Sequence, residues 1–271
     1  MRRQSLKRWL SILGALALIY LLAAYVVLPR LWFHREHEPG LEAMTAVTTT
    51  PQGIPGDPLN VGLVGDVKDV IRAMHLAGWF PADPITLESS LEITESVMLD
   101  RPYKDAPVST LLYDGRKQDL AFEKPIGASA DRRNHVRLWK VLDKGAEERP
   151  VWLGSATLDR GVGLSKYTGQ ITHHIAADID DERNYFIADL TRASVVTELY
   201  QLSGIGPTAA GRNGEGDWYH TDGEIKVAVI SPGAAIVSQS PKILAVSPLI
   251  QIKDGLWATA SGWIAPADPE K

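Results

Sequence analysis

The chain has 271 residues, of which 45% are hydrophobic and 23% are charged, the balance of an ordinary globular protein. Its formal net charge is −5, so no overall basic field predicts a nucleic-acid partner. It contains no cysteine, which excludes disulfides, thiolate metal ligands and a cysteine nucleophile. The length suits one large domain or two small ones.

The first recognisable element is the apolar segment at residues 9–28, which carries no charged residue. At about 1.5 Å per residue, a helix of this length crosses the roughly 30 Å hydrocarbon layer of a bilayer. It is longer than the apolar core of a cleaved signal peptide, and bulky residues follow it where a small-residue cleavage site would be needed. We therefore predict a transmembrane helix at 9–28 that anchors the protein in the lipid bilayer.

The charges that flank this segment predict its orientation. Four basic residues precede it, whereas two arginines and two glutamates follow it closely. Because the more basic end of a span stays in the cytoplasm, residues 1–8 are expected to be a cytoplasmic basic segment. The rest of the chain is then expected outside the cytoplasm, in the periplasm if the cell is Gram-negative.

The segment at residues 29–57 is rich in proline, glycine and threonine and shows little periodicity, which is typical of a linker or an extended arm. We expect the folded domain at 58–266, followed by a short tail at 267–271. The domain should begin with a short buried strand at 59–65. A helix at 67–78 follows, with Asp66 as its cap and Gly78 as its stop.

A second helix is predicted at 87–99, where apolar residues recur on one face. Strand patterns then dominate, and one more helix is expected at 180–193. The predicted strands lie at 108–113, 118–123, 135–142, 151–158, 170–176, 195–202, 224–230 and 243–251, with a further one at 256–263. This order indicates an α+β fold with a mixed or mostly antiparallel sheet and two or three helices, preceded by the transmembrane helix.

Two adjacent histidines lie in the predicted strand at 170–176. Because successive side chains of a strand point to opposite faces, His173 shares a face with isoleucines, and His174 shares one with Thr172 and other polar residues. The two imidazoles are therefore not expected to chelate one ion together. We interpret His173 as a core histidine with satisfied hydrogen bonds and His174 as a candidate site residue.

The same alternation places His135, Arg137 and Trp139 on one side of the strand at 135–142. In the next strand, Asp159 ends a polar side. If the strands pair with these sides together, His135, Arg137, Asp159 and His174 converge. The alternative is that the polar side is the solvated face of an antiparallel sheet and has no task.

The functional interpretation of this polar side is a hydrolase-like or anion-binding site. His135 or His174 would transfer protons near neutral pH, with Asp159 orienting the imidazole. Arg137 and Lys166 would hold a carboxylate or phosphate group. The candidate ligand-binding residues are Arg137, Lys166, Trp139 and Thr172.

A divalent metal ion is a further possibility at this site. Its candidate ligands are His135 and His174 with Asp178 or Asp159, which would leave a position for water. The carboxylates that follow Asp178 are also explained by the start of a helix, where negative charge is favourable. The glycines of the predicted loop at 159–169 would either expose backbone amides to an anion or simply serve a long strand connection.

Five segments together resemble the LssY C-terminal domain family: "DPLNVGLVGD", "AGWFPADPIT", "DGRKQDLAFEKP", "RNHVRLW" and "RPVWLGSATLDRGVGLSKYTGQITHHIAADID". The resemblance covers most of the chain after the linker. The positions that match the family's motif are His135, Arg137, Trp139, Asp159, Arg160, Gly161, His173 and His174. In that family the domain stands alone behind a membrane anchor or is fused to membrane phosphatases of the phosphatidic-acid phosphatase type. The Pro-Ser-Gly-His run of those phosphatases is absent here, so the resemblance does not imply phosphatase activity.

Two functions follow from these features. The first is a membrane-anchored domain of the cell envelope that hydrolyses or binds an anionic ligand, such as a phosphorylated lipid or glycan. It requires a histidine with a perturbed pKa near Asp159 in a concave pocket. The second is a non-catalytic module that binds another envelope protein, which would show an exposed apolar patch and solvated histidines.

Overall fold

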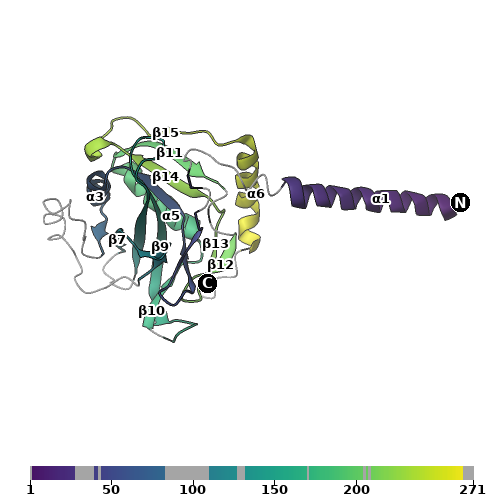
Figure 1. The fold of residues 1–271 in the computed structure, drawn as a ribbon, viewed down its shortest axis with the longest axis horizontal. Helices are drawn as coiled ribbons and strands as arrows, with labels where there is room; N and C mark the ends of the chain where they lie inside the picture. The colour runs from purple at the N-terminus through teal and green to yellow at the C-terminus, as the bar shows by residue number, and fades with distance from the viewer. Residues whose placement is uncertain are drawn as a thin grey trace.

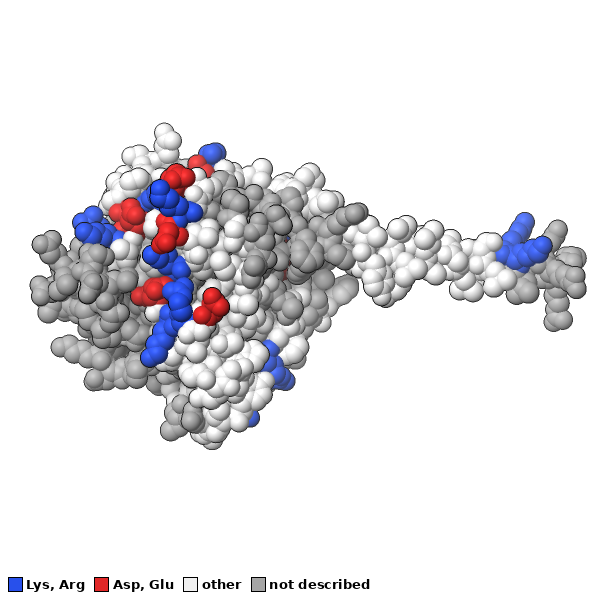
Figure 2. All heavy atoms as spheres, viewed as in Figure 1, with Lys and Arg blue, Asp and Glu red and all other residues white. Residues whose placement is uncertain are grey.

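The computed structural model describes residues 2–27, 40–41, 44–82, 110–126, 132–169, 171–203, 206 and 209–264. They form a long N-terminal helix and a globular part (Figure 1). The helix α1 (Arg2–Leu22) continues into a π-helical turn, η1 (Ala23–Val27). Its segment Lys7–Val27 has a mean hydropathy of 2.4 and is long enough to cross a membrane. Figure 2 shows an uncharged shaft with basic side chains near its far end.

A nine-stranded mixed sheet, the main sheet, forms the centre of the globular part. In spatial order its strands are β15 (Lys242–Ile243), β11 (Val196–Leu202), β14 (Ile225–Ile230), β3 (Val61–Val64), β9 (Val151–Leu164), β8 (Arg133–Leu142), β7 (Leu120–Pro125) and β4 (Phe80–Pro81), with β10 (Ile171–Ile175) paired to β9. The pairs β14–β3 and β11–β15 are parallel, and the others are antiparallel. The predicted α+β class is thus confirmed.

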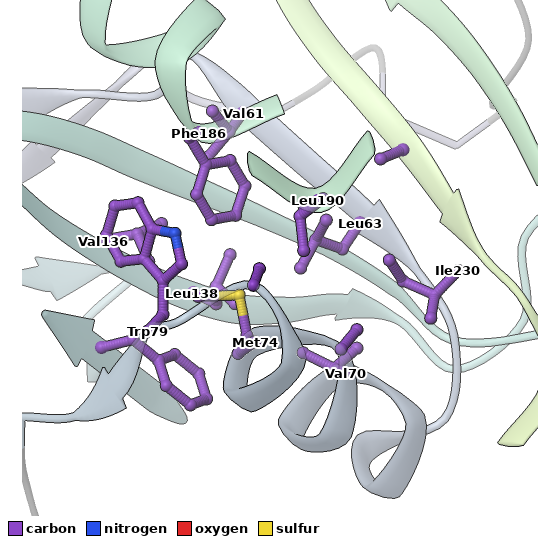
Figure 3. Close-up of a cluster of buried hydrophobic side chains, with 14 of the residues drawn as sticks. Val61, Leu63, Val70, Met74, Trp79, Val136, Leu138, Phe186, Leu190 and Ile230 are labelled. Carbon is purple, nitrogen blue, oxygen red and sulfur yellow. The ribbon is translucent and has the colours of Figure 1, made fainter. Parts of the chain in front are cut away.

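Two helices, α3 (Val67–Leu76) and α5 (Ile179–Arg192), cover one face of this sheet. Trp79 and Phe186 pack edge to face there, with ring centroids 5.2 Å apart, and Met74 of α3 lies among the same buried side chains (Figure 3). Both helices were expected, α3 from apolar residues between a cap and a glycine stop and α5 from the acidic residues near its start. The predicted helix at 87–99 lies outside the described residues.

A four-stranded sheet, here called the small sheet, contributes to the opposite side of the molecule. It consists of β2 (Pro55–Pro58), β1 (Val47–Thr49), β5 (Leu112–Tyr113) and β6 (Arg116–Lys117). Tyr113 packs against Trp139 of the main sheet, with ring centroids 5.8 Å apart, within a second hydrophobic cluster. Two of these strands belong to the segment 29–57, which the sequence predicts as a linker or extended arm.

The C-terminal helix α6 (Pro248–Ile264) corrects two predictions. Strands were expected at 243–251 and 256–263, but the only strand there among the described residues is β15. Pro248 occupies the first helical position, which suits its fixed φ and missing N–H. The Ser247 hydroxyl accepts a hydrogen bond from the Ile250 N–H at 3.4 Å, which satisfies one free amide of the first turn.

Basic and acidic side chains alternate over the face of the globular part shown in Figure 2, so neighbouring charges there neutralise one another. A short hairpin, β12 (Ala210–Arg212) and β13 (Trp218–His220), completes the fold. It was expected as a glycine-rich hairpin loop. The turn of this hairpin meets the strands that carry the candidate site residues.

Candidate functional site

Polar side chains of β8 and β9 occupy the face of the main sheet opposite α3 and α5, here called the polar face. The paired positions are Arg133 with Asp159, His135 with Thr157 and Arg137 with Ser155. All six are buried. The alternation in the sequence thus correctly predicts that His135, Arg137 and Asp159 share a side. The alternative of a solvated face does not apply to these residues.

The two arginines of the polar face make ion pairs with carboxylates of neighbouring strands. Arg137 Nη1 lies 3.1 Å from Asp57 Oδ2 of β2, and Arg133 Nη1 lies 3.0 Å from Glu123 Oε2 of β7. Buried ion pairs rarely stabilise a fold more than apolar residues of the same size would. The packing of the main sheet therefore does not by itself account for this cluster of buried charges.

A cavity of about 30 Å³, the central cavity, lies against these charges. It has room for about two water molecules, judged by the 10–15 Å³ that one water centre needs. Its lining residues are Asp57, Leu111, Arg133, His135, Arg137, Asp159, Thr172, His173, Ile175, Asn213, Gly214 and Glu215. They come from both sheets and from the β12–β13 turn, so the cavity exists only in the assembled fold.

His135 and Asp159 form the titratable centre of the cavity. His135 Nδ1 lies 3.2 Å from Asp159 Oδ2. Burial raises the pKa of Asp159 to about 7, although the guanidinium groups of Arg137 and Arg133 lower it. Burial, followed by the charges of the same two arginines, lowers the pKa of His135 well below 6.5. At neutral pH the imidazole is therefore neutral, and the carboxyl group is partly protonated.

Several buried polar atoms of the polar face make no hydrogen bond within the described part of the chain. These atoms are His135 Nε2, Arg137 Nε, Ser155 Oγ and Thr157 Oγ1. Buried polar groups in native proteins are nearly always paired with protein or with ordered water. One imidazole nitrogen, one guanidinium N–H and two hydroxyls of the polar face thus lack a hydrogen-bond partner among the described residues.

The β12–β13 turn is attached to the cavity by Asn213. Its Nδ2 donates to Asp57 Oδ1 at 3.1 Å, and its Oδ1 accepts from the N–H groups of Glu215 and Asp217 at 3.1 and 2.9 Å. Burial raises the pKa of Asp57, against the opposing charge of Arg137 and the Asn213 hydrogen bond. The turn therefore positions a second carboxyl group that accepts a proton readily.

His174 and Lys166, two candidates from the sequence, meet at Asp217 instead of lining the cavity. His174 Nδ1 lies 2.7 Å and Lys166 Nζ 3.4 Å from Asp217 Oδ1, while Asp217 Oδ2 accepts the Ile175 N–H at 3.1 Å. The His174 side chain is 28% exposed. The expected convergence of His174 with His135 is thus not observed, and His174 instead contacts the turn that borders the cavity.

His173 was interpreted as a core histidine with satisfied hydrogen bonds, and the core position is not observed. It is only partly buried, and it lines the central cavity together with Thr172. The cause is a β-bulge: His174 pairs with Gly161, but Ile175 pairs with Asp159, so β9 carries one extra residue. The extra residue brings His173 and Ile175, not His174, to the side of Asp159, while the alternation within β10 itself is kept.

The remaining predicted site residues lie elsewhere. Trp139 packs in the second hydrophobic cluster, and its Nε1 donates to the Arg116 carbonyl at 3.1 Å. Asp178 caps α5 by accepting the N–H groups of Asp180 and Asp181. Within the described residues no group of three His, Asp or Glu side chains has the geometry to hold a metal ion, and His135, His174 and Asp178 do not come together there.

Sequence reasoning missed Arg133, Asp57 and Asn213, which line the cavity, and Glu123, which pairs with Arg133. Arg133 and Glu123 had a usable signal. Arg133 lies two residues before His135 and therefore on the same side of that strand, and Glu123 ends a predicted strand. Asp57 and Asn213 had none. They lie in segments interpreted as a linker and a rim loop, and only the packing of β2 and the β12–β13 turn onto the main sheet brings them to the cavity.

Comparison with known protein families shows where this chain belongs. The family model described as "LssY C-terminus" matches residues 41–225, which is more than half of the chain. The chain belongs to the LssY C-terminus family. Searches of curated proteins and of solved structures give no significant match.

All residues that line the central cavity of this LssY C-terminal domain lie within the matched range, whereas α1 and α6 lie outside it. The match also includes β1 and β2, so Asp57 is part of the domain. Of the positions singled out by the resemblance, His135, Arg137, Asp159 and His173 line the cavity. His174 contacts its bordering turn, and Trp139 packs beneath the small sheet.

Proposed function

We propose that α1 holds this LssY C-terminal domain at a membrane, outside the cytoplasm, and that the central cavity binds the anionic group of a phosphorylated lipid or glycan. His135 and Asp159 transfer the protons of its hydrolysis. The carrying observation is the contact of a neutral imidazole with a carboxyl group whose pKa is about 7.

The chemistry assigns a different role to each group. Neutral His135 accepts a proton from water through Nε2 as the water oxygen attacks phosphorus. Protonated Asp159 gives its proton to the oxygen of the leaving alcohol, so that the products are the alcohol and inorganic phosphate or a phosphomonoester. A carboxyl group with a raised pKa suits the acid role near neutral pH. The proton then returns from His135 to Asp159 across their 3.2 Å contact.

Binding of the anion is coupled to proton uptake. Arg133 and Arg137 face three carboxylates, Asp57, Asp159 and Glu123, so the ionised cavity has no excess of positive charge. Protonation of Asp159 and Asp57 leaves the guanidinium groups to the ligand. The raised pKa of both aspartates makes this protonation accessible. A bound anion also raises the pKa of His135, which strengthens it as a base.

The other candidates have supporting roles in this proposal. Thr172 lines the cavity and offers a hydroxyl to the ligand. His174 and Lys166 hold Asp217 and thereby the turn that carries Asn213. Trp139 fixes β8 against the small sheet. His174, Lys166 and Trp139 are therefore positioning residues.

The proposal is tested by isothermal titration calorimetry of the full-length chain in detergent, with inorganic phosphate as the ligand. We expect the affinity to fall about tenfold per pH unit above the pKa of Asp159, if one proton accompanies each anion. His135→Gln and Arg137→Gln should abolish binding and the hydrolysis of 4-nitrophenyl phosphate or its bis-ester. His75→Gln, on α3 and away from the cavity, is the matched control.

Thermal unfolding of each variant shows whether it is folded. If folded His135→Gln and Arg137→Gln variants bind phosphate and hydrolyse both esters as the native chain does, the proposed site is wrong. Binding without turnover by the native chain would restrict the function to ligand recognition. No binding or turnover by the native chain would favour the non-catalytic interaction module.

A further inference from the structure

Helix α6 presents an uncovered apolar face. Four large side chains at helical spacing share one side of it: Leu249 (51% exposed), Ile252 (56%), Leu256 (67%) and Trp263 (87%). Its only charged residues are Lys253 and Asp254. An apolar helix face of this kind is unusual on a protein surface unless something covers it.

Contacts with the globular part fix the orientation of α6. Ile250, on the inner side of α6, is fully buried against the globular part. Lys253 pairs with the buried Glu224 and donates to the Asp222 carbonyl at 2.9 Å, and Asp254 accepts from Gln201 at 3.0 Å. Both charged residues are thus turned toward the domain. The apolar face points outward because the polar residues of the helix are already bound.

The connection to α1 places α6 close to the same bilayer. Leu41, at the entrance to the globular part, and Leu244, shortly before α6, belong to one hydrophobic cluster. Twelve residues separate Val27 from Gly40, and even a fully extended chain of this length spans only about 45 Å. In Figure 1, α6 stands on the side of the globular part from which α1 leaves.

We propose that α6 lies on the bilayer surface as an interfacial helix, with Leu249, Ile252, Leu256 and Trp263 inserted among the lipids. Tryptophan is favoured at this depth, and a monotopic helix buries one apolar face at the headgroup boundary. The inserted face carries no cation, so contact requires no anionic lipid and changes little with salt. This inference rests on the proposed membrane anchoring. Attachment through both α1 and α6 fixes the orientation of the domain on the membrane.

Because the chain has no native cysteine, one introduced cysteine can be labelled at a chosen position. Leu256→Cys and Ala258→Cys each receive one environment-sensitive dye in the full chain, reconstituted in phosphatidylcholine vesicles. Both positions are exposed, but at about 100° per residue they point to nearly opposite sides of the helix. We expect nitroxide lipids to quench the dye at 256 several-fold more than at 258, and aqueous iodide to show the reverse. Ile252→Ser with Trp263→Ser should remove the difference.

Vesicle flotation separates the possible failures. A chain that does not float with the vesicles contradicts the membrane anchoring itself. A chain that floats, with equal quenching at 256 and 258, contradicts only the role of α6. A dye at 256 that is protected from iodide but not quenched by nitroxide lipid would mean that a protein surface, such as a second copy of the chain, covers this face, and would overturn the proposal.

Discussion

Residue-scale chemistry in this domain depends on burial more than on residue type. Asp159 and His135 are ordinary side chains whose pKa values are shifted in opposite directions, mainly by their removal from water. The sequence pattern was sufficient to place both on one face together with Arg137. It was not sufficient for Asp57, because no local pattern links β2 to β8 across 80 residues.

The raised pKa of Asp159 predicts a pH-dependent stability. Its pKa is about 7 in the folded chain and 3.8 ordinarily, so the protonated carboxyl group favours the fold. This stabilisation is complete below pH 4 and is lost as pH rises toward 7. Relative to Asp159→Asn, the native chain should lose roughly 3 kcal/mol of unfolding free energy between pH 5 and pH 8.

Urea unfolding of the full-length chain in detergent at both pH values measures this difference. Asp114→Asn, at an exposed turn, is the matched control and should follow the native profile. Parallel profiles for Asp159→Asn and the native chain would show that Asp159 does not titrate in this range.

Element-scale features set the position of His174. It packs over Gly163 of β9, where an added Cβ would lie 2.5 Å from its Nε2. Gly161, two residues earlier on the same strand, has nothing within 4 Å of such a Cβ. The glycines of "DRGVGLSKYTG" were predicted to belong to a loop, but β9 continues to Leu164 and pairs with β10. Close packing explains Gly163 better than loop flexibility does.

Gly163→Ala should therefore displace His174 from Asp217 and cost about 1–3 kcal/mol of stability, the usual penalty of overpacking. Gly161→Ala should be neutral or slightly stabilising, because alanine restricts the unfolded chain. Chemical unfolding of the two variants gives the comparison. Equal stabilities would mean that the His174 imidazole moves away without loss.

At the scale of the whole molecule, the polar face is enclosed because the small sheet and the β12–β13 turn pack onto it. Under the proposed membrane attachment, α1 and α6 determine where the cavity can meet a ligand. In the proposed arrangement the domain lies at the outer surface of the membrane, within reach of phosphorylated envelope molecules.

A reporter fused to the C-terminus tests this arrangement. Alkaline phosphatase, which is active only outside the cytoplasm, should be active on the full-length chain, whereas β-galactosidase at the same position should be inactive. The reason is the basic cluster before the apolar span. The reverse pattern of activities would place the cavity in the cytoplasm and exclude an extracytoplasmic ligand.

The sequence by itself determined the apolar helix, the α+β class, most strands of the main sheet and the common side of His135, Arg137 and Asp159. These features follow from local periodicity and strand alternation, which short stretches of chain contain. Only the tertiary structure decided that His173 replaces His174 at the cavity, that Asp57 and Asn213 reach it, and that the apolar face of α6 is left uncovered. A bulge, a distant strand and a packed terminus are products of contacts between segments remote in the chain, and no local pattern records them.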